Sequence, residues 1–383
     1  MRSLPENPHS GIRPAPPVAK SLARIRASLR ARGLDACLIS RPENRFYLSG
    51  YLACDTSIDE SSGILLIRTA DPPLLLTDSR FQLHATEDTA EHGYDVLVYH
   101  AGILHFLSSL LPKLGVRKIG FEGRYTLHSF ANALIAQCAH QGIDAVPFDG
   151  VCERLRSLKD ATELDALEQA LLLAEKALQQ VVASMTEDAC ERDVALALDN
   201  TMIRLGAEGP SFPTIVAAGP NGAKPHAVPS GRTFCPGEPI IIDMGARLNG
   251  YCSDISRTVF VGEPDEHTRF RVRQVRRAQK AAIKAIRPGV TCSEPDRIAR
   301  RVLQEHKLDR FFTHSLGHGV GLAVHEAPAL KKNARKHFTP GMVVTVEPGI
   351  YLPGWGGIRL ENTVAVTETG VRVLNRDSTF LDL

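Results

Sequence analysis

The sequence predicts an α/β domain followed by a larger α+β domain. Three observations lead to this prediction. The chain has 383 residues, which is more than one ordinary domain needs. Helix and strand patterns alternate singly over residues 21–153, whereas residues 154–383 group them in blocks. Hydrophobic residues make up 43% and charged residues 23%, so both domains can bury a core and wholesale disorder is excluded.

Charge and hydropathy exclude two classes of partner. Lys and Arg number 45 against 43 Asp and Glu, which leaves a formal charge of +2. This balance gives no overall field to hold nucleic acid or an anionic membrane. No stretch approaches the roughly 18 consecutive apolar residues that a membrane span requires. We therefore expect neither nucleic acid nor a membrane as a partner.

The first 20 residues and the cysteines indicate a cytoplasmic protein. Residues 1–20 contain five prolines and no apolar run, which predicts a flexible tail rather than a signal peptide. The eight cysteines are scattered singly, without a C-x-x-C pair. We expect them to be reduced thiols, and a cysteine zinc site is improbable.

The first domain, residues 21–153, begins with a helix that should stop at Gly33, because Leu22, Ile25 and Leu29 recur at helical spacing. Apolar strands are expected at residues 36–40, 63–68, 73–78, 95–100 and 117–122, with a further helix at 103–115. This domain gathers neither metal ligands nor a nucleophile with a base. Its expected role is structural, oligomerising or substrate-gating.

The second domain, residues 154–383, should begin with a long amphipathic helix. Asp160 is a candidate N-cap and Glu163 follows three residues later, as in a capping box. Two more helices are expected at residues 271–286 and 293–306, after a strand-rich middle and before a strand-rich end.

A hairpin in the second domain brings two aspartates together. Asn249-Gly250 is a strong two-residue hairpin signal between apolar strands. If the loop is those two residues, Gly245 faces Asp254, and Asp243 lies diagonal to Asp254 on the same face. Diagonal neighbours lie about 7–8 Å apart at the backbone, so their carboxylates could grip metal ions roughly 3.5–4 Å apart. Two surface aspartates on an ordinary hairpin are an equal alternative from this segment alone.

Two glutamates appear on the C-terminal strands. Glu347 ends the strand in MVVTVEPGIYLP, and Glu361 lies in GIRLENTVAV, where Arg359, Glu361 and Thr363 share one face. A lone glutamate on a strand is usually solvated. Two glutamates on valine-rich strands, beside an aspartate hairpin, favour a common site.

The segment THSLGHGVGLAVHEAP supplies a histidine between these carboxylates. Gly317, Gly319 and Gly321 flank His318 and would let the backbone approach something bound, and His325 follows seven residues later. An imidazole added to four carboxylates suits Mn, Co, Fe or Zn. Four carboxylates also balance the charge of two divalent cations.

In order and local context, Asp243, Asp254, His318, Glu347 and Glu361 resemble the ligands of the dinuclear-metal peptidases of the pita-bread fold. RPENRFYLSGY, LLTDSRF and IGFEGR resemble the creatinase-type N-terminal domain that precedes the catalytic domain in Xaa-Pro peptidases. The resemblance covers nearly the whole chain. It implies a creatinase-like domain over residues 21–153 and a pita-bread domain over 154–383.

The resemblance also implies roles for these residues. Asp243 would chelate one metal, Asp254 and Glu361 would bridge both, and His318 with Glu347 would bind the second. His226 and His325 match non-ligand histidines near the substrate, Glu347 would move the proton, and Arg359 matches an arginine behind the ligands. The two divalent ions, manganese first with cobalt or zinc as alternatives, would bridge a hydroxide and polarise the scissile carbonyl.

The expected activity is removal of an N-terminal residue that precedes proline, by an Xaa-Pro aminopeptidase acting as a homodimer. The first alternative is an Xaa-Pro dipeptidase (prolidase), which needs a cation for the dipeptide carboxylate. Lys331, Lys332 or Arg335 could provide it, or could form a solvated charge run. A creatinase-like amidinohydrolase without metal, a non-catalytic module and a methionine aminopeptidase are weaker alternatives. Asn362 stands at a position where an aspartate is common in the family. We expect little effect on catalysis, because the side chain of Asn362 should point away from the metals.

Overall fold

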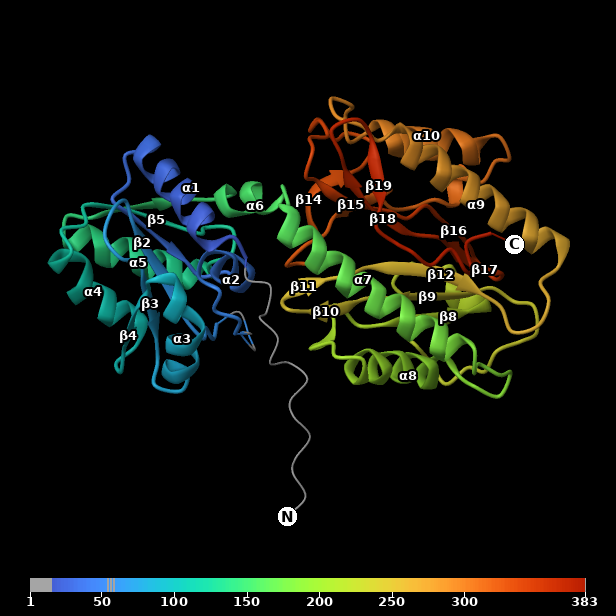
Figure 1. Ribbon diagram of the computed structural model, residues 1–383, viewed down its shortest axis with the longest axis horizontal. Coiled ribbons are helices and arrows are strands. Elements are labelled where there is room, and N and C mark those ends of the chain that lie inside the picture. Colours follow the sequence, from blue (N-terminus) through green and yellow to red (C-terminus); the bar gives the residue numbers. More distant parts are fainter. Residues whose placement is uncertain (1–15, 54, 56, 58, 383) are drawn as a thin grey trace, which may run out of the picture. The chain divides into compact units, whose positions relative to one another are not determined.

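The computed structural model describes residues 16–53, 55, 57 and 59–382. The chain divides into a first compact unit that ends at Arg156 and a second that begins at Ser157. Helix α6 (Val151–Arg156) belongs to the first unit, three residues beyond the boundary expected at residue 153. Most of the predicted tail lies outside the described residues, as does Cys54, but helix α1 already begins at Val18. Figure 1 shows the elements of both units.

The first unit is an α/β layer built on one six-stranded sheet in the order β4-β3-β2-β1-β5-β6 (Figure 1). Its strands are β1 (Ala36–Ile39), β2 (Ile64–Arg68), β3 (Leu74–Thr77), β4 (Asp95–Val98), β5 (Lys118–Phe121) and β6 (Asp144–Pro147). Its helices besides α6 are α1 (Val18–Ala31), α2 (Pro42–Ser49), α3 (Gln82–Thr89), α4 (Ile103–Lys113) and α5 (His128–His140), with a 3₁₀ turn at Ala90–His92. The helices and strands predicted for this region are present.

Apolar periodicity explains this unit. Leu22, Ile25 and Leu29 of α1 are buried, as their spacing predicts. The central strands β1, β2 and β3 are buried almost throughout, which explains why they read as continuous apolar runs rather than alternations. The sheet is mixed, since β1 pairs antiparallel with β2 and parallel with β5.

The second unit combines four helices and several short antiparallel sheets. The helices are α7 (Ala161–Val182), α8 (Glu191–Arg204), α9 (Glu266–Ala285) and α10 (Glu294–Gln304), with 3₁₀ turns at Gly219–Ala223 and Asp309–Phe311. The strands of its first half are β7 (Gly209–Pro210), β8 (Ile215–Ala218), β9 (Ile240–Met244), β10 (Ala246–Leu248), β11 (Tyr251–Cys252) and β12 (Ile255–Val259). Those of its second half are β13 (Gly317–Gly319), β14 (Glu326–Leu330), β15 (Val343–Val346), β16 (Gly349–Leu352), β17 (Gly356–Arg359), β18 (Asn362–Val366) and β19 (Val371–Val373).

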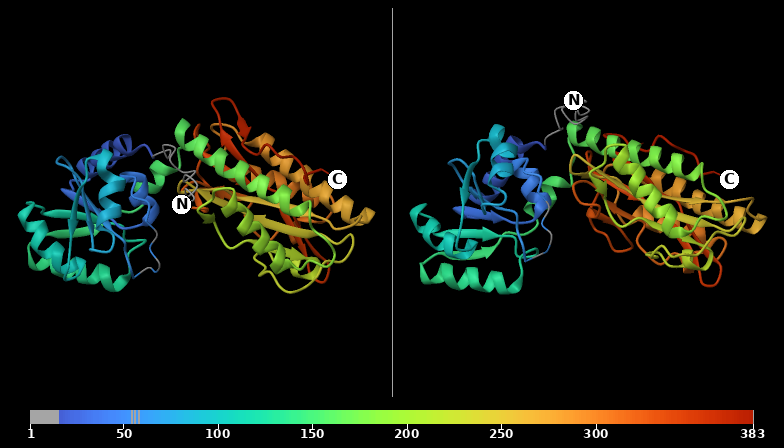
Figure 2. Two further views of the ribbon diagram at one scale, coloured as in Figure 1. Left: turned by 60° about the horizontal axis from the view of Figure 1, so that its bottom comes forward. Right: turned by 90° about the horizontal axis from the view of Figure 1, so that it is seen from below.

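Each half of the second unit has its own helix pair and core. Helices α7 and α8 pack on β8, β9 and β12, and helices α9 and α10 pack on β15, β17 and β18. Both helix pairs can be followed beside their strands in Figure 2. The capping box predicted at the start of α7 is present, because Asp160 accepts from the backbone of Thr162 and Glu163 while Glu163 accepts from the backbone of Asp160.

The aspartate hairpin has the predicted register. Leu248 pairs with Tyr251, and Met244 pairs with Ile255 in the same register farther along. Gly245 therefore lies opposite Asp254. The two turn residues Asn249 and Gly250 have φ of 51° and 78°, the left-handed values that a two-residue hairpin of this kind requires.

The strand predicted across GIRLENTVAV is interrupted. β17 ends at Arg359 and pairs with β16, whereas β18 begins at Asn362 and pairs with β15. The alternation of side chains nevertheless continues across the break, since Ile358, Leu360 and Val364 are buried in one core. Glu361 lies at the point where the chain passes from one sheet to the other, which directs its carboxylate away from that core.

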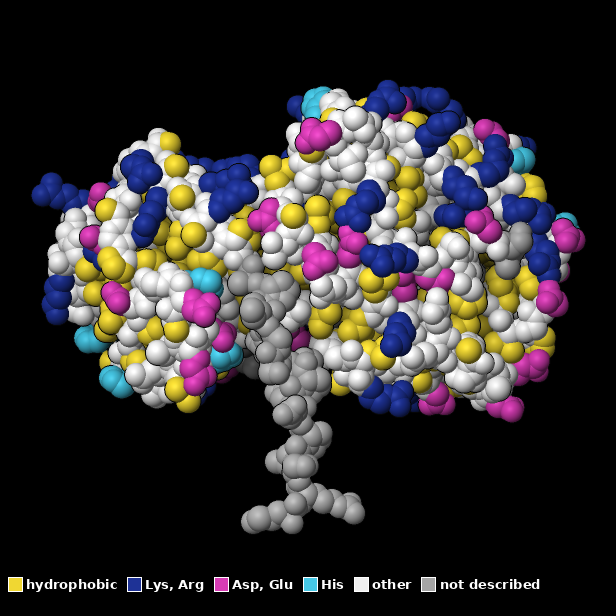
Figure 3. Space-filling model, in the orientation of Figure 1, with side chains coloured by type: hydrophobic (Ala, Val, Ile, Leu, Met, Phe, Trp, Pro, Cys, Tyr) yellow, Lys and Arg dark blue, Asp and Glu magenta, His cyan; other side chains and the backbone are white. Residues whose placement is uncertain are grey.

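No helix among the described residues has the length and apolar character needed to cross a bilayer. The surface in Figure 3 carries Lys and Arg intermixed with Asp and Glu, in keeping with the near-zero net charge. The cysteines within the described ranges, which exclude Cys54, are free thiols.

Candidate metal centre

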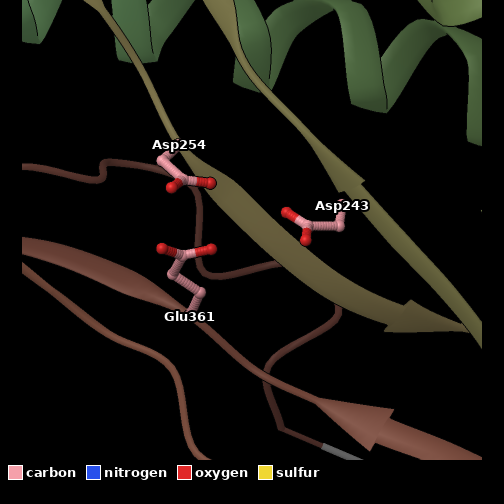
Figure 4. A group of neighbouring side chains, drawn as sticks. All are labelled: Asp243, Asp254 and Glu361. Atoms are coloured by element: carbon pink, nitrogen blue, oxygen red, sulfur yellow. The ribbon is translucent and has the colours of Figure 1, made fainter. Parts of the chain in front are cut away.

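Three carboxylates converge in the second unit. Asp243 lies on β9, Asp254 immediately precedes β12, and Glu361 lies between β17 and β18. One oxygen from each lies within 4.8 Å of the others. Figure 4 shows the three groups turned toward one shared space. The hairpin register places the two aspartates, and the passage between the two sheets brings Glu361 to them.

His318 and Glu347 complete the group expected from the sequence. His318 is the central residue of β13, and Glu347 directly follows β15. His318 Nε2 lies 3.5 Å from Asp254 Oδ2 and 3.3 Å from Glu347 Oε1. The structure thus brings together all five residues that were predicted to hold metal, although their sequence positions span more than 100 residues.

Two of the three converging carboxylates, Asp254 and Glu361, are buried in surroundings that disfavour their charge. Burial raises the pKa of Asp254 well above its usual range, and the charge of Glu361 adds to this. Burial likewise raises the pKa of Glu361, together with the charge of Glu347. Asp243 Oδ1 and Glu361 Oε1 are buried and have no hydrogen-bond partner among the described residues. Buried carboxylates of this kind are normally paired or bind a metal, so the donor set fits divalent cations.

His318 and Glu347 form a separate, mutually stabilising pair. Burial opposes a charge on His318, but its hydrogen bond with Glu347 and the negative charge of that residue outweigh burial and raise the pKa of His318. Burial also opposes the charge of Glu347, but the hydrogen bond with His318 lowers the pKa of Glu347.

Arg359 lies behind the cluster and holds Asp243. Its side chain is buried, and its Nη2 pairs with Asp243 Oδ2. Its Nε donates to Ser256 Oγ at 2.8 Å, and its Nη1 donates to Tyr351 Oη at 2.8 Å and to the Pro225 carbonyl at 3.2 Å. Arg359 therefore forms a salt bridge with a candidate ligand, and that salt bridge orients Asp243.

A cavity of about 660 Å³ opens onto these residues. His226 and His325 both line it, as the sequence interpretation requires. The His325 ring lies 4.3 Å from that of His318, edge to face. Burial lowers the pKa of His325, and the charge of His318 adds to this, so the neutral imidazole is favoured. Part of the wall is apolar and is formed by Phe212, Pro213, Ile215, Pro225, Ala227, Val228 and Pro229.

Sequence reasoning did not single out His314 and Tyr351. His314 lines the cavity, and its Nε2 lies 2.9 Å from Tyr351 Oη, which also accepts from Arg359. Burial lowers the pKa of His314. The signals were a histidine four residues before His318 and a tyrosine four residues after Glu347, but neither spacing identifies a site without the fold.

Two further expectations from the sequence can be compared with the geometry. The glycines around His318 make room for neighbouring strands: a Cβ on Gly317 would lie 2.0 Å from the Thr345 carbonyl oxygen, and one on Gly319 would lie 2.4 Å from that of Ala327. Gly317 also lines the cavity. Asn362 is buried at the start of β18 and does not line the cavity.

The basic residues proposed for a dipeptide carboxylate do not line the cavity. Lys331, Lys332 and Arg335 are exposed. Among the described lining residues, Arg359 is the single Lys or Arg, and it is already paired with Asp243.

The comparisons with known proteins agree with this geometry. The chain is 33% identical over 343 residues to an Xaa-Pro dipeptidase of Pyrococcus horikoshii, covering 90% of this chain and 93% of the relative. It is similar to the solved structure of an Xaa-Pro dipeptidase from Bacillus anthracis (TM-score 0.86, 32% identity, 95% of this chain and 99% of that one). It is also similar to that of an X-Pro aminopeptidase from Thermotoga maritima (TM-score 0.82, 33% identity, 92% and 98%).

Two family models match the two units. The model described as Creatinase/Prolidase N-terminal domain matches residues 22–158, and the model described as Metallopeptidase family M24 matches residues 165–368. The creatinase-like and pita-bread fold expected from the sequence is confirmed. The chain belongs to metallopeptidase family M24 and carries the creatinase/prolidase N-terminal domain of that family's Xaa-Pro branch.

Proposed function

We propose that this protein is a metal-dependent exopeptidase that cleaves the bond between an N-terminal residue and a following proline. The observation that carries the proposal is the convergence of four carboxylates and His318 beside a cavity with a partly apolar wall. The names of the relatives support the choice of substrate. A proline ring is apolar and its nitrogen carries no hydrogen, which suits a wall of this chemistry.

Asp243, Asp254, His318, Glu347 and Glu361 would hold the cations, two in number and manganese first. Bound divalent cations acidify a water molecule and polarise the carbonyl of the bond to be cleaved. Glu347, which is hydrogen-bonded to His318, would take up the proton that the attacking water loses and would return it to the leaving prolyl nitrogen. His325 and His226 face the same cavity and donate hydrogen bonds to the substrate where negative charge develops. Arg359 keeps Asp243 oriented.

Two forms of the activity have separate support. The relatives favour a dipeptidase, because the similar proteins named Xaa-Pro dipeptidase span nearly the whole chain. The cavity favours an aminopeptidase that accepts longer peptides, because the one Lys or Arg among its described lining residues is held by Asp243 and no second one faces a dipeptide carboxylate.

Hydrolysis of Gly-Pro, Gly-Pro amide and Gly-Pro-Pro by the manganese-loaded full chain decides between these forms. A dipeptidase cleaves Gly-Pro in preference to the other two. An aminopeptidase cleaves the amide and the tripeptide at least as well, because neither places a carboxylate beside the proline ring. Cleavage of none of the three, with a full metal complement, would contradict the proposal and favour a creatinase-like or non-catalytic role.

The remaining expectations from family resemblance belong to the same proposal. Elemental analysis of protein purified without chelator tests the number and identity of the cations. Light scattering tests the homodimer.

A further inference from the structure

Glu191 is a completely buried carboxylate that does not line the cavity. It is the first residue of α8 and is 0% exposed. Its Oε1 accepts from the Ala218 backbone N–H at 2.7 Å. Its Oε2 accepts from Asn221 Nδ2 at 2.8 Å, from the Ser230 backbone N–H at 2.9 Å and from Ser230 Oγ at 2.7 Å. One side chain thus receives four hydrogen bonds from three residues.

The two backbone donors, of Ala218 and Ser230, lie at the two ends of a single loop. Ala218 ends β8, and Ser230 follows the loop of residues 219–229. Glu191 therefore closes the loop at its base. Asn221 strengthens the closure from inside, since its Nδ2 also lies 3.2 Å from the Val228 carbonyl oxygen. A carboxylate that accepts several such bonds fixes both chain segments in one geometry.

Residues farther inside the same loop form part of the cavity wall. Pro225, His226 and Val228 line the same cavity as Asp243 and Asp254. The Pro225 carbonyl accepts from Arg359 Nη1 at 3.2 Å, so the loop also contacts the residue that orients Asp243. His226 is itself exposed, so its position depends on how the loop that carries it is held.

We propose that Glu191 is a positioning residue for the hydrolytic reaction: it holds the loop of residues 219–229 so that His226 faces the substrate. The inference rests on the proposed function, because His226 acts on substrate only there. None of the groups that Glu191 binds belongs to the candidate metal ligands. The residue therefore affects the placement of His226 rather than the capture of metal.

A double-mutant cycle tests the proposal in the manganese-loaded full chain. We expect Glu191→Gln to lower kcat/KM on the best Xaa-Pro substrate by about tenfold, because small displacements of a positioned group are expensive in rate. In the His226→Ala background the same change should have less than about a twofold effect, since the group it positions is gone. Asp193→Asn is the matched control, because Asp193 is an exposed acidic residue in the same first turn of α8. An undiminished loss in the His226→Ala background would overturn the proposal.

Two further measurements do not depend on the activity. The manganese affinity of Glu191→Gln, from calorimetry, should equal that of the unchanged protein, and a loss comparable to that in kcat/KM would contradict the proposed role. Backbone amide exchange across residues 218–230 should become faster in this variant than in Asp193→Asn, and unchanged exchange would also overturn the proposal. If the unchanged protein proves inactive on Xaa-Pro substrates, the exchange result still reports on loop closure, and the two failures remain distinguishable. If Glu191→Gln does not fold, Ser230→Ala removes one of its hydrogen bonds and should show the same effects at smaller size.

Discussion

The protein buries carboxylates in two opposite ways, which Glu122 of the first unit and the carboxylate cluster of the second unit illustrate. In the first unit, Glu122 accepts from the backbone N–H groups of Ser40 and Arg41 at 2.6 and 2.8 Å and from Asn44 Nδ2 at 2.5 Å. In the second unit, the cluster of Asp243, Asp254 and Glu361 leaves two buried oxygens without a partner among the described residues. The protein itself supplies the donors for the first carboxylate. The second cluster is complementary to cations, and this difference separates a structural carboxylate from a candidate metal site.

The largest expected effect is the loss of a central member of the carboxylate cluster. Asp254→Ala should lower kcat by at least about 10²–10³-fold, the scale of losing one electrostatic stabiliser of a transition state. Metal content per chain, measured on the same sample, should fall as well. Full activity in this variant would show that the cluster is not the catalytic centre. An intact metal content with lost activity would separate binding of metal from catalysis.

Removal of metal should weaken the fold of the second unit more than that of the first. A cation present at several hundred times its dissociation constant stabilises the state that binds it by about 3–4 kcal/mol. Dialysis against a chelator should therefore lower the unfolding temperature, and manganese should restore it. Amide exchange should rise around β9 and β12 but not in β1 or β5. Equal loosening of both units would break the comparison.

The pH dependence of that effect has a definite sign. The pKa values of Asp254 and Glu361 are raised in the folded state, so their contribution to stability is present below the ordinary carboxyl pKa and is lost as pH rises through the folded pKa. Glu347, whose pKa is lowered, contributes in the opposite direction and loses its contribution as pH falls. The difference in unfolding temperature between metal-loaded and metal-free protein should therefore widen from about pH 5 to about pH 8. Over this range, bound cations replace the protons that Asp254 and Glu361 retain in the metal-free protein.

Glu163 has hydrogen-bond donors from the protein, as Glu122 does, and its pKa is raised, as are those of Asp254 and Glu361. It accepts from the Asp160 backbone at 3.1 Å and from Tyr251 Oη at 3.3 Å, yet burial raises its pKa to about 7. Its contribution to stability is thus complete below about pH 4.5 and is lost by about pH 8, a change of about 3 kcal/mol. Glu163→Gln keeps an acceptor for the capping box but does not ionise.

The measurement for Glu163 is urea unfolding at two pH values. Relative to the unchanged protein, Glu163→Gln should gain up to about 3 kcal/mol in unfolding free energy between about pH 4 and about pH 8. Glu187→Gln, at an exposed position before α8, should show no such gain. A difference that does not depend on pH would mean that Glu163 stays ionised in the folded chain.

The sequence predicts those features that depend on local patterns. The spacing of Leu22, Ile25 and Leu29 identifies α1, and Asn249-Gly250 specifies the register that places Asp243 diagonal to Asp254. A two-residue turn determines every pair that follows it in the hairpin. The convergence of Glu347 and Glu361 with that hairpin required a family resemblance, because no local rule connects strands about 100 residues apart.

Other features depend on tertiary contacts and have no local signal. The break between β17 and β18 arises because successive segments pair with different partners, while the alternation of apolar residues continues across it. Glu191 reads as an ordinary acidic residue in the first turn of a helix, and only the fold reveals that it closes a loop. Similarly, the glycines beside His318 indicate a close approach, but the sequence does not reveal that a neighbouring strand makes it.

The smallest expected effect concerns Glu122, the structural carboxylate of the comparison. A glutamine there would direct its NH₂ group either at two backbone N–H groups or at Asn44 Nδ2, which are all donors. Asn44 cannot turn over to accept, because its Oδ1 already accepts from Arg156 Nη1 at 2.6 Å and its Nδ2 also donates to Glu153.

Glu122→Gln should therefore lower the unfolding free energy by about 1–3 kcal/mol, the cost of leaving a buried donor unsatisfied, with kcat and metal content unchanged. Glu91→Gln, at an exposed position of the same unit, should change neither quantity. Denaturant unfolding and steady-state kinetics on the same samples provide the comparison. If Glu122→Gln instead lowered kcat as Asp254→Ala does, the first unit would take part in the reaction. Hydrogen-bond donors supplied by the protein would then no longer distinguish a structural carboxylate from a candidate metal ligand.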